Sequence, residues 1–214
     1  MTQASSEERV KLVLASASPR RLALLEQAGI TPDLLNPVDI DERPKKREAG
    51  RTLVSRLALM KARTATASGQ VRLLGANVFI LACDTAVTVG RRILPKTETL
   101  EEASDCLWML SGRAHRVYSA ICLITPKGHR QTRVVDTRVR FKRLSREEIE
   151  SYLVSDEWRG KAGGYAIQGR ADAFVRSLNG SYSNVVGLPL YETINMLQGA
   201  GYPVYHSWMN YEPR

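Results

Sequence analysis

The chain alternates between short apolar runs of strand length and longer stretches in which apolar residues recur every three or four positions. The short runs predict strands, and the longer stretches predict amphipathic helices. Strands are expected at 12–14, 34–40, 78–82 with a continuation through 86–89, 93–94, 117–125, 132–141 and 173–178. Helices are expected at 19–28, 51–68, 99–110, 145–153 and 189–197. Because strands and helices interleave and one antiparallel pair is included, the pattern predicts an α/β fold with a mixed sheet.

Local signals mark where several of these elements begin and end. Thr99 with Glu102, and Ser145 with Glu148, have the spacing of a capping box, in which each residue satisfies a backbone N–H of the helix start. Asn-Gly at 179–180 is a turn signal. These signals agree with the apolar periodicity on either side of them.

The first strand and the first helix are joined by a turn of small residues, and this junction carries two arginines. Ser18 stands at the position preferred for a helix N-cap, Pro19 at the first helical position, and Arg20 and Arg21 in the first turn. A helix N-terminus presents free N–H groups and a positive dipole end, to which two guanidiniums add forked donors. The junction suits a polyphosphate. Two arginines solvated at a surface turn explain the pattern equally well, and the sequence leaves both interpretations open.

Composition narrows the class of protein. The 214 residues are 43% hydrophobic, enough for a substantial core, and we expect one domain over 9–208. Lys and Arg number 31 against 22 Asp and Glu, a formal charge of +9, which favours an anionic partner without choosing among nucleic acid, membrane surface and phosphorylated small molecule. The polar N-terminus and the absence of a long apolar run predict a soluble, cytoplasmic protein. Three isolated cysteines and three histidines without ligand spacing argue against a disulfide framework and a zinc enzyme.

Carboxylates at two places are candidates for metal binding or proton transfer. Asp84 directly follows the apolar run at 78–83, and an acidic residue at the end of a buried strand can serve as a metal ligand or general base. A turn Asp that accepts backbone N–H groups is the alternative. Asp39, Asp41 and Glu42 could bind a hard cation if they fold near Asp84, although a solvated acidic loop is the more common case.

Two lysines and a glycine-rich segment are candidates for substrate binding. Lys61 interrupts the apolar face of its helix and Lys96 follows a hairpin, so either could reach a phosphate or extend its ammonium to solvent. The segment 161–169 (KAGGYAIQG) combines glycines with Gln168, whose amide both donates and accepts hydrogen bonds, as a base-reading residue must. A flexible surface loop is the alternative. Neither GxxxxGK[ST] nor GxGxxG occurs in the sequence.

Eight short motifs, taken in order along the chain, resemble the Maf family of nucleoside triphosphate pyrophosphatases, once described as septum-formation inhibitors. They are SASPRR at 16–21, IDE at 40–42, RLALMKA at 56–62, CDTAV at 83–87, SGRAH at 111–115, SDE at 155–157, KAGGYAIQG at 161–169 and NGSYSNVVGLPLYET at 179–193. Each motif is weak by itself, but the ordered set is specific and extends from about residue 12 to 198.

The resemblance implies an elongated α/β structure with a mixed sheet and a cleft between two lobes, similar to inosine triphosphate pyrophosphatases. It implies hydrolysis of the α–β phosphoanhydride of a nucleoside triphosphate with Mg²⁺ or Mn²⁺ as cofactor. By position, Asp84 corresponds to the general base, and Glu42 and Asp84 to the metal ligands. The side chains implied to hold the triphosphate are Ser16, Ser18, Arg20, Arg21, Lys61 and Lys96.

Thr85 and Gln168, together with Arg20, resemble the specificity positions of the subgroup that prefers dTTP and UTP. The family also implies a homodimer. Two other functions remain to be weighed: a pyrophosphatase for other nucleotides such as methylated GTP, and a non-enzymatic basic module acting on nucleic acid or on the division machinery. No helix-turn-helix, zinc or RRM signature supports nucleic-acid binding, and no membrane partner is expected.

Overall fold

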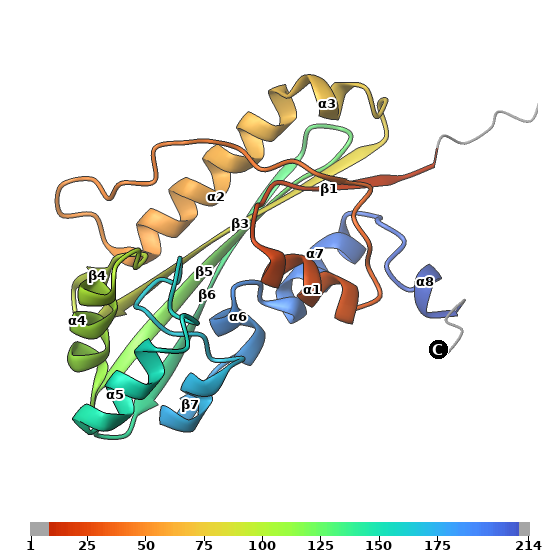
Figure 1. The fold of residues 1–214 in the computed structure, drawn as a ribbon. Coiled ribbons are helices and arrows are strands. Elements are labelled where there is room, and N and C mark those ends of the chain that lie inside the picture. The colour runs from red at the N-terminus through yellow and green to blue at the C-terminus, as the bar shows by residue number, and fades with distance from the viewer. Residues whose placement is uncertain (1–8, 210–214) are drawn as a thin grey trace, which may run out of the picture.

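The structure, a computed structural model, describes residues 9–209 (Figure 1). Its strands are β1 (Lys11–Leu14), β2 (Leu34–Leu35), β3 (Val78–Val89), β4 (Arg92–Leu94), β5 (Ala114–Ile124), β6 (Arg130–Phe141) and β7 (Val175–Asn179). Its helices are α1 (Pro19–Gln27), α2 (Gly50–Ala67), α3 (Gly69–Arg72), α4 (Leu100–Leu110), α5 (Arg146–Leu153), the 3-10 helix η1 (Arg170–Phe174), α6 (Tyr182–Val186), α7 (Leu190–Gly199) and α8 (His206–Met209).

One mixed sheet organises these elements, as predicted. The strand order is β2-β1-β3-β5-β6-β7, with β4 paired to β3 outside this order. β1 runs parallel to β2 and β3, whereas the β3–β4, β3–β5, β5–β6 and β6–β7 pairs are antiparallel. The long strands β3, β5 and β6 form a twisted ribbon that gives the molecule its elongated outline (Figure 1). The α/β class and the mixed sheet are thereby confirmed.

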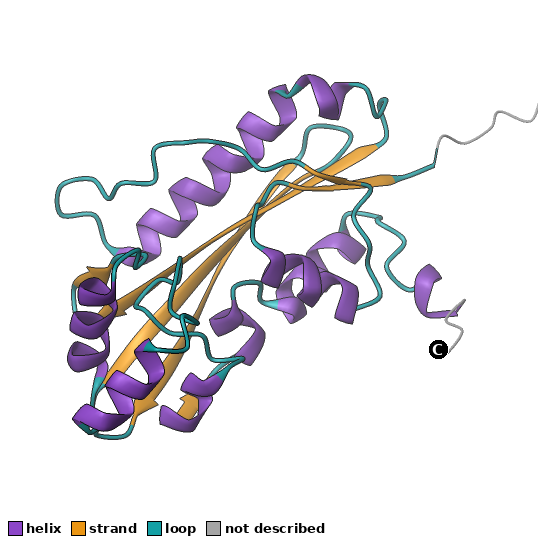
Figure 2. Ribbon diagram, in the orientation of Figure 1, coloured by secondary structure: helices purple, strands orange, loops and turns teal. Residues whose placement is uncertain are grey.

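Helices cover both faces of the sheet, so its central strands are apolar on both sides (Figure 2). Val13 and Ile80 pack with the apolar side of α2, for example with Leu57. Their neighbours in sequence, such as Leu14 and Leu81, point to the other face and join the core that includes α1, α4 and α7. The strand period of two therefore divides the interior into two clusters.

The two predicted capping boxes are present. In each, the N-cap hydroxyl accepts from the N3 backbone N–H and the N3 carboxylate accepts from the N-cap backbone, at Thr99 with Glu102 and at Ser145 with Glu148. The first helix has Ser18 at its N-cap and Pro19 at its start, as predicted. Within the described chain the Ser18 side chain makes no capping hydrogen bond.

Several predicted ends are wrong. β2 covers only 34–35 of the predicted 34–40, because Pro37 has no N–H for a ladder and the following residues pack as a loop against the α2 cluster. The strand expected at 173–178 starts at Val175, since residues 170–174 form η1. The segments α3 and α6, of four and five residues, are too short to show a helical period and were not expected.

No helix among residues 9–209 has both the length and the apolar composition needed to cross a membrane.

Candidate active site

The candidate site lies where β3 continues past the end of its parallel neighbour. β1 ends at Leu14 beside Leu81, and β4 pairs with β3 only from Val87 onward. Asp84 and Thr85 lie between these two pairings, beside the turn that leads from β1 into α1. The prediction that Asp84 ends its strand is wrong: β3 is continuous because β5 pairs with it on the other side throughout 80–88.

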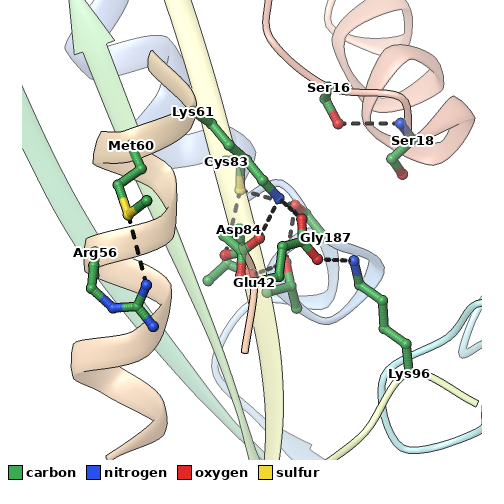
Figure 3. A network of polar contacts seen from close by, with 12 residues as sticks. Ser16, Ser18, Glu42, Arg56, Met60, Lys61, Cys83, Asp84, Lys96 and Gly187 are labelled. Atoms are coloured by element: carbon green, nitrogen blue, oxygen red, sulfur yellow. Dashed lines mark hydrogen bonds and ion pairs between the residues drawn. The ribbon is translucent and has the colours of Figure 1, made fainter. Parts of the chain in front are cut away.

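Asp84 faces α2, where it meets an alternating chain of acidic and basic side chains (Figure 3). Lys61, from α2, donates to Asp84 Oδ1 at 2.5 Å and to Glu42 Oε1 at 2.6 Å. Lys96, approaching from the opposite side, pairs with the second oxygen of Glu42. The side chains of Lys61 and Asp84 are 9% and 7% exposed, whereas that of Lys96 is 52% exposed. The network thus runs from the interior to the surface.

The two lysines govern the ionisation of Glu42. Partial burial by itself raises the pKa of this carboxyl, but the hydrogen bonds and positive charges of Lys61 and Lys96 outweigh burial and lower the pKa from 4.5 to about 2. Glu42 is therefore ionised at neutral pH and can accept hydrogen bonds or bind a cation.

A salt bridge on α2 holds the loop that carries Glu42. Arg56 binds both carboxylate oxygens of Glu48 at 2.8 Å and donates to the carbonyl of Arg43 at 3.0 Å. Asp41 does not enter the site, because it pairs with Arg43 at the surface. Of the predicted acidic group, only Glu42 is brought to Asp84.

Thr85 points to the other face, where Arg21 crosslinks three segments. Arg21 Nε donates to Gly187 O at 2.9 Å, Nη1 to Ser16 Oγ at 3.1 Å and Nη2 to Thr85 Oγ1 at 3.2 Å. Ser16 Oγ also accepts from Ser18 N at 3.2 Å. The alternative of two solvated surface arginines is therefore wrong for Arg21, which is committed to the β1–α1 turn, β3 and the segment after α6.

Arg20 is the less satisfied of the two arginines. Among the residues that the structure describes, its Nε is buried without a hydrogen-bond partner. Burial and then the neighbouring charge of Arg21 lower the pKa of Arg20. A guanidinium in this condition gains by binding an anion, which would supply the missing acceptor and offset the repulsion.

Two adjoining cavities bring the predicted site residues together. The larger, of about 350 Å³, is lined by nine of them: Ser16, Ser18, Arg20, Arg21, Glu42, Lys61, Asp84, Thr85 and Lys96. The smaller, of about 60 Å³, shares several of these and is also lined by Gln168. Each of the ten predicted residues therefore lines at least one of these two adjoining cavities.

The glycine-rich segment forms one wall of the smaller cavity. Residues 163–167 are buried, so the surface-loop alternative is wrong. Gly163 N donates to Pro95 O at 2.9 Å, and a Cβ on Gly164 would lie 3.2 Å from the Cα of Ala103. These contacts position Ile167 and Gln168 beside the cleft.

Burial also decides between the two interpretations of Lys61. The ammonium of Lys61 does not extend to solvent but lies between two carboxylates.

Sequence reasoning missed the contributions of Arg56, Ser119 and Gly187, although Arg56 and Gly187 lie within the quoted motifs. Ser119 carried no signal, because its position depends on the register of β5 against β3.

The donor set fits a hard divalent cation. Glu42 and Asp84 direct carboxylate oxygens at the same cationic nitrogen of Lys61, so their charges converge on one point. Mg²⁺ is commonly bound by one or two carboxylates, with substrate phosphates and water completing its shell. Within residues 9–209 no three His, Cys, Asp or Glu side chains are placed so that they could hold a metal ion together, so a cation here would need the substrate's oxygens as well.

Comparison with known proteins gives a consistent result over nearly the whole chain. The family model described as "Maf-like protein" matches residues 11–200. A protein of Mesorhizobium japonicum named dTTP/UTP pyrophosphatase is 60% identical over 95% of this chain and 98% of its own length. One of the same name from Rhodopseudomonas palustris strain HaA2 is 59% identical over 94% of this chain and 98% of its own.

Two solved structures that match this chain are less similar to it. A nucleoside-triphosphatase (dITP/XTP pyrophosphatase) from Mycobacterium abscessus matches 63% of this chain and 76% of its own, with 19% identity and a TM-score of 0.39. A HAM1 protein from Coxiella burnetii matches 64% of this chain and 76% of its own, with 19% identity and a TM-score of 0.45.

Proposed function

The chain belongs to the Maf family, and from this premise we propose that it hydrolyses dTTP and UTP to the monophosphate and pyrophosphate. The observation that carries the proposal is the convergence of two acidic and five basic residues on one cleft at the end of β1. Hydrolysis of a phosphoanhydride needs little covalent chemistry from the protein beyond positioned cations and an activated water.

The two cavities divide the substrate between them in this proposal. The larger cavity takes the triphosphate, where Arg20, Arg21, Lys61 and Lys96 supply positive charge and Ser16 and Ser18 supply polar groups from the β1–α1 turn. The smaller cavity takes the base, because it combines an amide at Gln168 with apolar and backbone surface. Thr85 lines both cavities, so its hydroxyl can contact the base bound in the smaller one.

Asp84 is the proposed general base. Its carboxylate accepts a proton from water as the water oxygen bonds to the α-phosphorus, and the α–β bridging bond breaks to release pyrophosphate. Lys61 holds Asp84 in place through the 2.5 Å contact, and the cationic side chains stabilise charge on the departing pyrophosphate. Each atom of the step is supplied by substrate, water and these residues.

We assign Glu42 and Asp84 as ligands of Mg²⁺ or Mn²⁺. When bound, such an ion supplies Lewis-acid stabilisation of phosphate charge. The ammonium of Lys61 already contacts both carboxylates. If a cation bound there, it would replace part of these contacts.

Pyrophosphate release from a panel of nucleoside triphosphates tests the proposal. With Mg²⁺ or Mn²⁺ we expect fastest release from dTTP and UTP, with the monophosphate as the second product and no release in the presence of chelator. Release of inorganic phosphate and a diphosphate would instead place cleavage at the β–γ bond. Absence of release from every nucleotide would overturn the proposal.

Three further properties accompany this function. We propose that residues 9–208 act as one catalytic domain, which the single seven-stranded sheet supports. We also propose a homodimer, which the family resemblance implies, and a cytoplasmic location, which the sequence interpretation predicts. Sedimentation tests the first and cell fractionation the second.

A further inference from the structure

A buried serine that lies outside both cavities is hydrogen-bonded to the side chain of Thr85. Ser119, opposite Thr85 in the β3–β5 register, is 0% exposed, and the two hydroxyl oxygens lie 2.8 Å apart. Ser119 Oγ is also 3.1 Å from the carbonyl oxygen of Asn184, a residue that is 0% exposed. Thr85 itself is half-buried and lines both cavities.

The contacts favour one direction for these hydrogen bonds. A carbonyl oxygen can only accept, so Ser119 uses its single proton on Asn184 O. Thr85 must then donate its own proton to Ser119. Arg21 has only donors, so Thr85 accepts from Arg21 Nη2 at 3.2 Å. The chain runs in one direction from Arg21 through Thr85 and Ser119 to the backbone.

The opposite arrangement is poorer. If Ser119 donated to Thr85, the Thr85 proton would go to Gly187 O at 3.4 Å. That carbonyl already accepts from Arg21 Nε at 2.9 Å and from Cys83 Sγ at 3.1 Å. The 3.1 Å bond to Asn184 O would also be lost at a buried carbonyl, which costs about 1–3 kcal/mol.

We propose that Ser119 is a positioning residue for base selection. It accepts the hydrogen bond that the Thr85 hydroxyl donates, so that toward the cleft Thr85 can only accept a hydrogen bond through its remaining lone pair. The ligand group selected is an N–H donor. Uracil and thymine carry such a donor at N3, whereas cytosine has an unprotonated acceptor nitrogen at this position. The inference rests on the proposed function for the identity of the ligand, and Ser119 itself touches no substrate.

Removal of the Ser119 hydroxyl provides the test. In Ser119→Ala the Thr85 proton is free to turn toward the cleft, so Thr85 can donate to the cytosine acceptor as well as accept from uracil. We expect the ratio of kcat/KM for UTP over CTP to fall about tenfold, the discrimination carried by one hydrogen bond. Ser119→Cys replaces the hydroxyl with a slightly larger thiol, which is a weaker hydrogen-bonding group, and should give an intermediate ratio.

A double-mutant comparison separates selection from mere support of the fold. In a Thr85→Val background, Ser119→Ala should leave the UTP-over-CTP ratio unchanged, because the hydroxyl that it orients is gone. The matched control is Thr193→Val, which removes another fully buried hydroxyl that donates to a backbone carbonyl, Pro189 O at 2.8 Å. This control should lower stability without changing the ratio.

Binding of UMP and CMP, measured by calorimetry, needs no turnover and so keeps this inference distinct from the proposed function. A wild-type preference for UMP that falls in Ser119→Ala supports the inference even if no nucleotide is hydrolysed. The same UTP-over-CTP and UMP-over-CMP ratios in wild type and Ser119→Ala would overturn it, whatever the activity.

Discussion

At the scale of single residues, Lys61 shows how the site depends on paired charges. The sequence indicated that an ammonium interrupts the apolar face of its helix, but could not say whether it met solvent or carboxylates. That outcome depends on the loop of Glu42 and the register of Asp84, which lie 19 and 23 residues away in the sequence. The motifs therefore predicted the residue types of the candidate site, whereas the pairing of these residues required the three-dimensional structure.

Replacement of Lys61 by Met should be strongly destabilising. It leaves the buried carboxylate of Asp84 and the partly buried Glu42 without their shared cation, and breaking such a buried pair costs about 3 kcal/mol in the free energy of unfolding. Urea unfolding at neutral pH measures this loss in the free energy of unfolding. The matched control is Lys96→Met, which removes a half-exposed partner of the same Glu42 and should cost less than about 1 kcal/mol. Equal losses in the two variants would contradict the account.

Gln168 is predicted to affect substrate choice without affecting stability. Its side chain is exposed at the smaller cavity, so Gln168→Glu should leave the urea midpoint unchanged. The Glu carboxylate lacks the N–H donors of the Gln amide. We therefore expect the preference for dTTP and UTP over other nucleotides to fall about tenfold. Gln131→Glu, at an exposed position on β6 that does not line the two site cavities, is the control. An unchanged substrate ranking in Gln168→Glu would remove this residue from base recognition.

At the scale of elements, periodicity and capping signals located most helices and strands because they are local properties of the sequence. The exceptions have local causes that periodicity does not report, such as Pro37 after β2 and the 3-10 turn before β7. The wall of the smaller cavity depends on packing between distant elements. Tyr165 donates or accepts at 2.8 Å with His115 Nε2 on β5, and both rings pack edge-to-face on Phe141 of β6.

This packing makes stability depend on pH. Burial lowers the pKa of His115 from 6.5 to about 4, so between these values the unfolded chain binds the proton and the folded chain does not. The free energy of unfolding therefore includes a contribution from neutral His115 that is fully present above pH 6.5. This contribution, about 3 kcal/mol, is lost as the pH falls toward 4.

Urea unfolding of wild type and His115→Gln at pH 7 and pH 4 checks this prediction. Gln does not titrate, so the variant should lose about 3 kcal/mol less than wild type over this interval. The difference between the two proteins is the quantity to compare, because other groups titrate equally in both. Parallel losses would show that His115 does not carry the effect.

At the scale of the whole molecule, the formal charge of +9 indicated an anionic partner but not its class. The fold supplies the missing information by placing five basic residues on one cleft beside two carboxylates. The remaining basic residues include Arg56, which stabilises a loop. Net charge therefore predicted the sign of the ligand, and topology determined where the ligand could bind.

Salt should weaken the binding of substrate more than it slows the chemical step. A triphosphate is attracted by the positive field of the cleft, and ions screen this attraction over about 10 Å at 0.1 M salt. We expect KM for UTP to rise several-fold between about 0.05 and 0.5 M salt at saturating metal, with kcat changed less than twofold. Steady-state kinetics with uridine triphosphate measures both parameters. A KM independent of salt would contradict electrostatic capture.

The most direct test of the central claim is the effect of Asp84→Asn on pyrophosphate release from UTP, measured beside UTP binding by calorimetry. The amide keeps an oxygen for Lys61 but cannot take the proton of the attacking water. We predict a loss of turnover of at least about a thousandfold, with UTP affinity changed less than about tenfold. Turnover near the wild-type rate in this variant would contradict the assignment of Asp84 as the general base.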